Sequence, residues 1–99
     1  MDMKKLMAQA QKMQAQMKEK QDELDASLFE TEAGGGAVKV QMYGDFTVEK
    51  IEIDKDAIDP DDKEMLEEMI MIAVNSSIES IRKEQDDITK SMSAGLPGM

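Results

Sequence analysis

Apolar residues recur at intervals of three and four along the first part of the chain, at Met3, Leu6, Ala10, Met13, Met17 and Leu24. This is the spacing of a coiled-coil seam, with Lys20 interrupting the series. No glycine or proline occurs before Gly34, and Ala, Gln, Lys and Met favour helices. The pattern predicts a helix within residues 1–26, roughly 35 Å long. Part of its apolar stripe must therefore meet another helix or another copy of the chain.

A period of two follows in the middle of the chain, where Val38, Val40 and Met42 alternate with polar or larger residues. This alternation is typical of a half-buried strand, and residues 28–33 can form another strand before it. In the next strand the apolar positions change parity between Val48 and Ile51, which predicts a bulge near residues 49–50. Residues 27–54 are thus expected to form a three-stranded antiparallel sheet.

Two glycine-containing segments are expected to turn the chain. Gly44-Asp45 reads as a two-residue type II′ hairpin turn, after which Phe46 and Val48 would begin the next strand on one face. The run of three glycines ending at Gly36 could cradle a phosphate or let the chain turn. Because Ala37 and a strand follow it, rather than a Lys-Ser/Thr pair and a helix, the sequence favours a connection between strands.

The segment "DPDDKE" predicts the start of a second helical region, 59–91, with Asp59 as N-cap and Pro60 in the first helical position. The first half of this region carries an apolar face suited to covering the sheet: Leu66, Met69, Ile70 and Ala73. The second half returns to coiled-coil spacing at Ile78, Ile81, Ile88 and Met92, and a break between the halves stays open. Residues 92–99 are expected to be a mobile tail, and the fold class is α+β.

Composition argues against an enzyme. The chain of 99 residues has neither cysteine nor histidine, so its serines lack the usual base, and no catalytic residue is nominated. The acidic run from Asp54 to Glu64 fails as a calcium loop, because Ile58 and Asp59 stand where an oxygen ligand and a glycine are needed. No metal, cofactor or small-molecule substrate is expected. No apolar run approaches the roughly 20 residues that span a bilayer, so we expect a soluble cytoplasmic protein without a membrane partner.

Charge is distributed unevenly along the chain. The formal net charge is -10, yet residues 1–21 carry five lysines against Asp2 and Glu19, a net of +3. On a heptad repeat, four of these lysines fall on outward positions, and three basic residues of the second helix are segregated from its acids. An ordinary solvated helix face is one reading, and a surface for a polyanion is the other. The candidate contacts for such a polyanion, which become DNA contacts only through the family resemblance given next, are Lys4, Lys5, Lys12, Lys18, Arg82, Lys83 and Lys90.

The central block "GGGAVKVQMYGDFTVEKIEID", residues 34–54, resembles the signature of the YbaB/EbfC family of bacterial nucleoid-associated proteins. The first helix, the "AVNSS" segment and the closing "GLPG" are also similar to that family. The resemblance implies a homodimer with a shared β layer and projecting helices that grip duplex DNA, serving nucleoid organisation and gene regulation. The residues that would supply the sheet core and the dimer contact are Val38, Val40, Met42, Val48, Ile51 and Ile53.

A second interpretation is a protein-binding adaptor or holdase that uses the two helical seams and their methionine-rich faces. Salt separates the two interpretations, because binding through phosphates weakens steeply with salt whereas apolar capture persists. The sequence shows no recognition helix with base-reading side chains, so any preference among DNA sequences is expected to come from DNA shape. It also leaves open whether dimers associate further.

Overall fold

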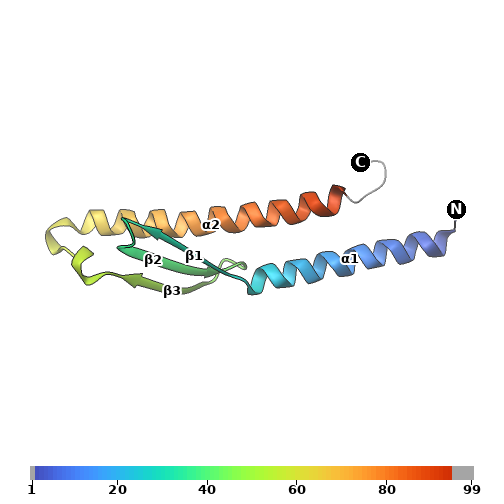
Figure 1. Ribbon diagram of the computed structural model, residues 1–99, viewed down its shortest axis with the longest axis horizontal. Coiled ribbons are helices and arrows are strands. Elements are labelled where there is room, and N and C mark those ends of the chain that lie inside the picture. The colour runs from blue at the N-terminus through green and yellow to red at the C-terminus, as the bar shows by residue number, and fades with distance from the viewer. Residues whose placement is uncertain (1, 95–99) are drawn as a thin grey trace.

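The computed structural model of the protein describes the backbone of residues 2–94 and the side chains of residues 2–91. Helix α1 (Met3–Ala26) leads into strands β1 (Leu28–Ala33), β2 (Val38–Tyr43) and β3 (Val48–Ile53). Two 3-10 turns, η1 (Lys55–Ala57) and η2 (Pro60–Asp62), then precede helix α2 (Lys63–Ala94). The molecule is elongated, 71 × 22 × 15 Å, with the sheet near one end and α1 reaching toward the other (Figure 1). The predicted α+β fold is confirmed.

The sheet is an antiparallel meander in the order β1-β2-β3. In its register Thr31 pairs with Val40, and Val40 pairs with Ile51. Gln41 pairs with Lys50 and Met42 with Val48, which leaves Glu49 as an extra residue in β3. The predicted bulge is confirmed, and it puts the apolar residues before and after it on one face of the sheet.

Helix α2 covers one face of the sheet and packs on β1 and β2. The core there is formed by Ala33, Val38, Val40 and Ala73, with the predicted apolar face of α2 packed against it. Small residues allow the helix to approach closely. Ser77, which is completely buried, meets the hydroxyl of Thr31, and Thr31 also donates to the backbone carbonyl of Ala73 at 2.7 Å.

The loop between β2 and β3 differs from the prediction. Four residues, 44–47, separate the two strands. The amide of Tyr43 donates to the carbonyl of Thr47 at 2.8 Å, so three residues rather than the predicted two lie between this pair. Phe46 lies in this loop, not in the strand, and it takes the left-handed conformation at φ 69°. Gly44 is absent from the positive-φ residues, so the type II′ assignment was wrong.

Gly44 is needed for a different reason. Its amide donates to the carbonyl of Ser27 at 2.9 Å, and a Cβ at this position would collide with the backbone carbonyl of Leu24. The hairpin therefore presses directly on the last turn of α1. The contact fixes where α1 leaves the sheet.

The three consecutive glycines form the turn between β1 and β2, as predicted. All three have positive φ values, 64°, 65° and 94°, which side chains other than hydrogen rarely tolerate. At Gly34 a Cβ would also collide with the sulfur of Met69 on α2. No helix N-terminus follows this turn, because Val38 begins a strand.

The second helical region starts with a 3-10 turn instead of an α-helix. Asp59 caps it, with its side chain accepting a hydrogen bond from the amide of Asp61 at 2.9 Å, and Pro60 occupies the first position. From Lys63 the helix is continuous to Ala94, so it has no break between its halves and ends three residues beyond Ser91. Residues 95–99, which include most of the expected tail, lie outside the described residues.

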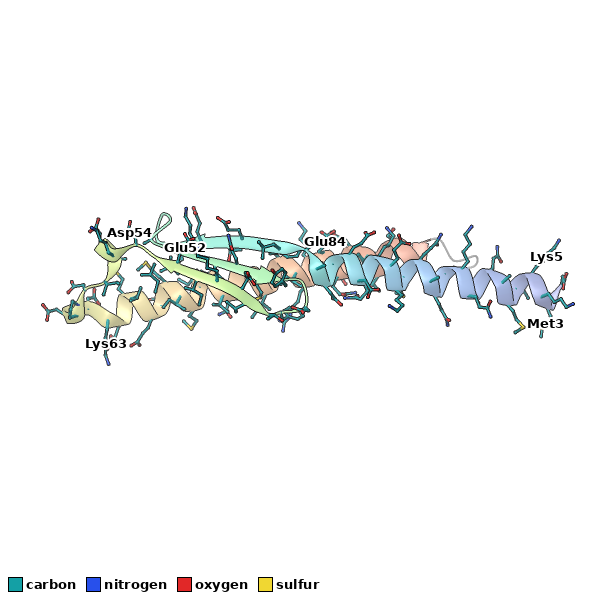
Figure 2. All side chains as sticks on the ribbon, turned by 90° about the horizontal axis from the view of Figure 1, so that it is seen from below. Met3, Lys5, Glu52, Asp54, Lys63 and Glu84 are labelled. Atoms are coloured by element: carbon teal, nitrogen blue, oxygen red, sulfur yellow. The ribbon has the colours of Figure 1, made fainter. Side chains whose placement is uncertain are left out.

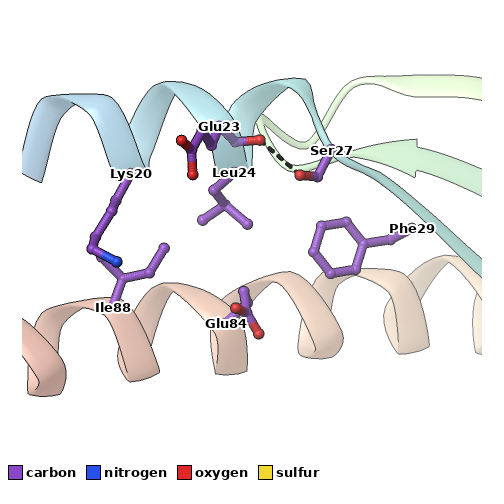
Figure 3. Close-up of a pocket in the computed structure, with 7 residues that line it drawn as sticks. All are labelled: Lys20, Glu23, Leu24, Ser27, Phe29, Glu84 and Ile88. Carbon is purple, nitrogen blue, oxygen red and sulfur yellow. Dashed lines mark hydrogen bonds between the residues drawn. The ribbon is translucent and has the colours of Figure 1, made fainter.

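Helices α1 and α2 meet near the base of α1. Leu24 is the only buried residue of α1, 4% exposed, and it lies beside Phe29 and opposite Ile88 (Figure 3). The side chain of Ser27 donates to the carbonyl of Glu23 at 2.7 Å and thereby closes the helix end. The sequence predicted that part of the apolar stripe meets another helix or another copy of the chain, and within one chain the contact with α2 involves the last turns of α1.

Candidate nucleic-acid interface

The part of α1 before this contact, residues 3–19, is here called the arm. Its N-terminal end extends past the C-terminal end of α2 (Figure 1). The apolar stripe of the arm has little to pack against: Met3 is 72% exposed, Met7 59% and Leu6 42%. Only Met13 is half-buried. The arm is therefore a helix held at one end, with most of its surface open to a partner.

The lysines of the arm lie on the side away from α2. With 3.6 residues per turn, Lys4, Lys5 and Lys12 lie roughly 100–160° around the helix from Leu24, the residue that faces α2. Lys5 and Lys12 are two turns apart and border the same shallow depression. Among residues 2–91, no acidic side chain forms an ion pair with any of these three lysines. They form a row of exposed, uncompensated positive charge.

Two other nominated residues carry compensated charge. Lys18 contacts Asp22 at 2.9 Å, and Lys90 contacts Asp86 at 3.2 Å. The hydrogen bond to Asp22, followed by its negative charge, raises the pKa of Lys18 above its ordinary value. Both pairs have the i,i+4 spacing that commonly joins opposite charges on a helix, so the sequence already contained this signal. These two lysines are weaker candidates for phosphate contacts.

The remaining nominated residues form a separate patch. Arg82 and Lys83 are exposed on α2 and border a depression with Phe46 of the β2–β3 loop. Figure 2 labels Lys5 near the end of the arm and Glu84 near the middle of the molecule. The structure therefore does not join the basic residues of the two helices into one site. One chain presents two separate patches with basic residues: one on the arm, and one beside the hairpin, where Asp86 lines the same depression as Arg82 and Lys83.

Sequence reasoning missed Phe46 as part of this second patch. Its ring is 49% exposed, and its φ of 69° is unusual for a bulky residue. The loop conformation that places it beside Arg82 depends on the approach of Gly44 to α1. No local pattern in the sequence indicated that approach.

The six residues nominated for core and dimer contact fall into two groups. On β2, Val38, Val40 and Met42 are buried, at most 2% exposed. On β3, their cross-strand partners are 37–43% exposed: Val48, Ile51 and Ile53. All six lie on the α2 side of the sheet, yet α2 packs on β1 and β2. An apolar strip along the edge strand is therefore left open.

Groups typical of other site classes are not found in the described part of the chain. Across residues 2–91 there is no cluster of acidic side chains arranged to hold a metal ion. No helix within residues 2–94 is long and apolar enough to cross a membrane.

An exposed helical arm with uncompensated lysines, attached to a small sheet backed by a second helix, is a surface suited to binding polyanions. The comparisons with known proteins agree with this class. The sequence matches the YbaB/EbfC DNA-binding family over residues 1–96, and the chain belongs to that family.

Related proteins support the assignment. A nucleoid-associated protein of Ligilactobacillus salivarius (strain UCC118) is 40% identical over 99 residues, covering 100% of this chain and 95% of that protein. One from Pelotomaculum thermopropionicum is 47% identical over 91 residues, covering 92% of this chain and 84% of that protein. The crystal structure of an uncharacterized protein from Helicobacter pylori has the same fold. Its TM-score is 0.78 at 21% identity, covering 93% of this chain and 97% of that one.

Proposed function

We propose that the protein binds double-stranded DNA as a homodimer in the bacterial cytoplasm, where it contributes to nucleoid organisation and gene regulation. The observation that carries the proposal is the row formed by Lys4, Lys5 and Lys12 on the arm of a chain from a DNA-binding family. Lysine contacts with phosphates supply affinity without reading bases, so neither a cofactor nor a base-reading helix is needed.

The overall charge of -10 does not prevent this, because the arm tip carries three lysines against Asp2 alone, and the densest group of acids, residues 54–68, lies at the other end of the molecule (Figure 2). Asp54 and Lys63 mark one end of the molecule and Lys5 the other (Figure 2), along a length of 71 Å. The Debye length is about 10 Å at 0.1 M ionic strength, so the acidic end is screened from a phosphate at the arm. The local charge of the arm therefore dominates the interaction.

The apolar strip on β3 supports a dimer. Val48, Ile51 and Ile53 continue the face of the buried core but are exposed in the single chain. Packing two such strips together would remove them from water and join two sheets into one layer, with β3 as the open edge of each. A dimer would also present two arms. Six lysines on the two arms would then be available for phosphates.

The decisive experiment is fluorescence anisotropy of a labelled DNA duplex, titrated at about 50 and 200 mM salt. Six phosphate contacts would lower the affinity by about 10³ over this range. In the Lys5→Glu/Lys12→Glu variant, binding should be lost at both salt concentrations while helicity is retained. Lys55→Glu/Lys63→Glu is the matched control, because it changes the net charge equally at the acidic end and should bind far better than the arm variant.

Exposed apolar residues on the arm, Met3, Leu6 and Met7, support the rival function of a protein-binding adaptor or holdase. The same titration separates the two functions. Salt-insensitive DNA binding, or equal effects of the arm variant and its control, would contradict the proposal. Absence of DNA binding at low salt would favour the rival and direct the search to protein partners.

A further inference from the structure

A hollow lies near the end of the molecule opposite the arm tip, between the β1–β2 turn and the start of α2. It has a volume of about 590 Å³. Its apolar lining residues, here called the floor, include Ala37, Ala57, Met65 and Met69. Its four acidic lining residues, all exposed and here called the rim, are Asp54, Asp56, Asp59 and Asp62. Met65 is 54% exposed, so the floor has no covering side chain over much of its area. We call this feature the acidic hollow.

The carboxylates of the rim are only partly used within the chain. Asp54 and Asp59 each accept one backbone hydrogen bond that caps a 3-10 turn, at 3.0 and 2.9 Å, and Asp62 accepts one from the amide of Met65 at 3.4 Å. Among residues 2–91, none of the four rim carboxylates forms an ion pair. Residues 54–68 contain eight acids and two lysines, a net of -6. Such a concentration of like charge favours the approach of a cationic, partly apolar partner.

The arm tip has the complementary chemistry. Met3, Leu6 and Met7 are exposed apolar side chains beside Lys4 and Lys5. Residues 2–12 contain three lysines against Asp2, a net of +2. The floor of the hollow is rich in methionine too, and flexible thioether side chains adapt well to one another. Apolar contact in the centre and opposite charges at the rim would make a conventional small interface.

A chain cannot make this contact with itself. Figure 2 labels Met3 and Lys5 at one end and Asp54 and Lys63 at the other, and the molecule is 71 Å long. An arm tip that occupies the hollow must therefore come from a second copy. We propose that the arm tip of one molecule docks in the acidic hollow of another, a head-to-tail contact distinct from the β3 strip.

Such a contact joins two different surfaces, so it does not close on itself in a pair as a twofold contact does. Molecules can add at either end, and the association grows with concentration. If the proposed DNA binding holds, Lys4 and Lys5 serve both partners. DNA would then compete with the acidic hollow and release the molecules from one another.

The test uses the full chain without DNA, so its outcome does not depend on the DNA proposal. Sedimentation velocity at about 50 mM salt should show a mass that rises with protein concentration, and about 500 mM salt should abolish the rise. Lys4→Glu/Lys5→Glu and Asp56→Lys/Asp62→Lys should each weaken the association about tenfold. An equimolar mixture of the two variants should restore it. The unchanged arm of one variant can dock in the unchanged hollow of the other, and the two altered surfaces also carry opposite charges.

Several results would overturn the inference: no concentration-dependent mass at low salt, association unaffected by either variant, or weakening by the arm variant alone. The inference would also be overturned if an equimolar mixture of the two variants, both well folded, failed to associate. The comparison is made in the Ile51→Asp background as well, where the proposed β3 contact is removed. Circular dichroism establishes that every variant retains its helices.

Discussion

The hydroxyl of Thr31 on β1 lies 2.5 Å from the hydroxyl of Ser77 on α2. Because Thr31 donates to the carbonyl of Ala73, Ser77 is left as the donor to Thr31. The two residues are 46 positions apart in the chain, and Ser77 is completely buried. A short polar chain thus joins sheet and helix where small side chains allow them to approach.

This relationship predicts coupled effects on stability. Ser77→Ala should lower the free energy of unfolding by about 1 kcal/mol, since it removes the hydrogen bond to Thr31. Thr31→Val should lower it by about 2 kcal/mol, since it removes that bond and the one to the carbonyl of Ala73. The double variant should cost less than the sum of the two. Urea denaturation measures all three, with the neighbouring Ser76→Ala as a control expected to change stability by less than about 0.5 kcal/mol. Strict additivity would show that the bond contributes nothing.

Gly44→Ala tests the close approach of the hairpin to α1. The added methyl group would strike the carbonyl of Leu24, so we expect a loss of about 3 kcal/mol in unfolding free energy. Gly35→Ala is the comparison, because a Cβ there meets nothing within 4 Å and only its φ of 65° opposes the change. That variant should lose about 1–2 kcal/mol. An equal loss at both positions would mean that the contact with Leu24 relaxes at little cost.

Ile51→Asp tests the proposed dimer. Ile51 is 42% exposed in the single chain, so the variant should fold but remain monomeric in light scattering after gel filtration. Ile58→Asp introduces the same change at a side chain that is 55% exposed outside the sheet, and it should leave the dimer intact. A dimeric Ile51→Asp protein with normal helicity would place the dimer contact elsewhere.

Tyr43 offers a direct optical measurement, since the chain contains one tyrosine and no tryptophan. The negative charge of Glu49 raises the pKa of Tyr43 above its ordinary value of 10.0, with burial adding to the effect. The protonated phenol is therefore favoured by folding, and this stabilisation is present below pH 10 and lost as the pH rises through the folded pKa. Glu49→Gln should lower the pKa in a tyrosinate absorbance titration. An unchanged titration would exclude Glu49 as the cause.

Much of the fold could be predicted from local patterns. The apolar positions of β3 change from one face to the other, which required a bulge, and the triple glycine required a turn. The segment "DPDD" predicted a capped start of the second helical region. The loop around Gly44 could not be predicted, because its conformation depends on the carbonyls of Leu24 and Ser27, which approach only in three dimensions. The exposure of Ile51 could not be predicted from the sequence either. Its position in the strand matches a core residue, and only the path of α2 across the sheet leaves it open.

The candidate interface was predictable in composition but not in arrangement. Counting charges identified the basic start of the chain, and the helical period placed its lysines on an outward face. Sequence reasoning did not separate Lys5 and Lys12 from Lys18, although Asp22 stands four residues after Lys18. It also could not show that Arg82 lies in a patch apart from the arm. That separation depends on the angle at which α1 leaves the sheet.

Glu49 pairs with no residue of β2, yet it sets the orientation of half of β3. Removing one residue there would turn Ile51 and Ile53 to the opposite face and replace them with Lys50 and Glu52. Related chains can therefore change the number of residues between Val48 and Ile51 only by an even number if the edge strip is to stay apolar. The bulge thus restricts which insertions and deletions the lineage can accept, independently of the identity of any side chain.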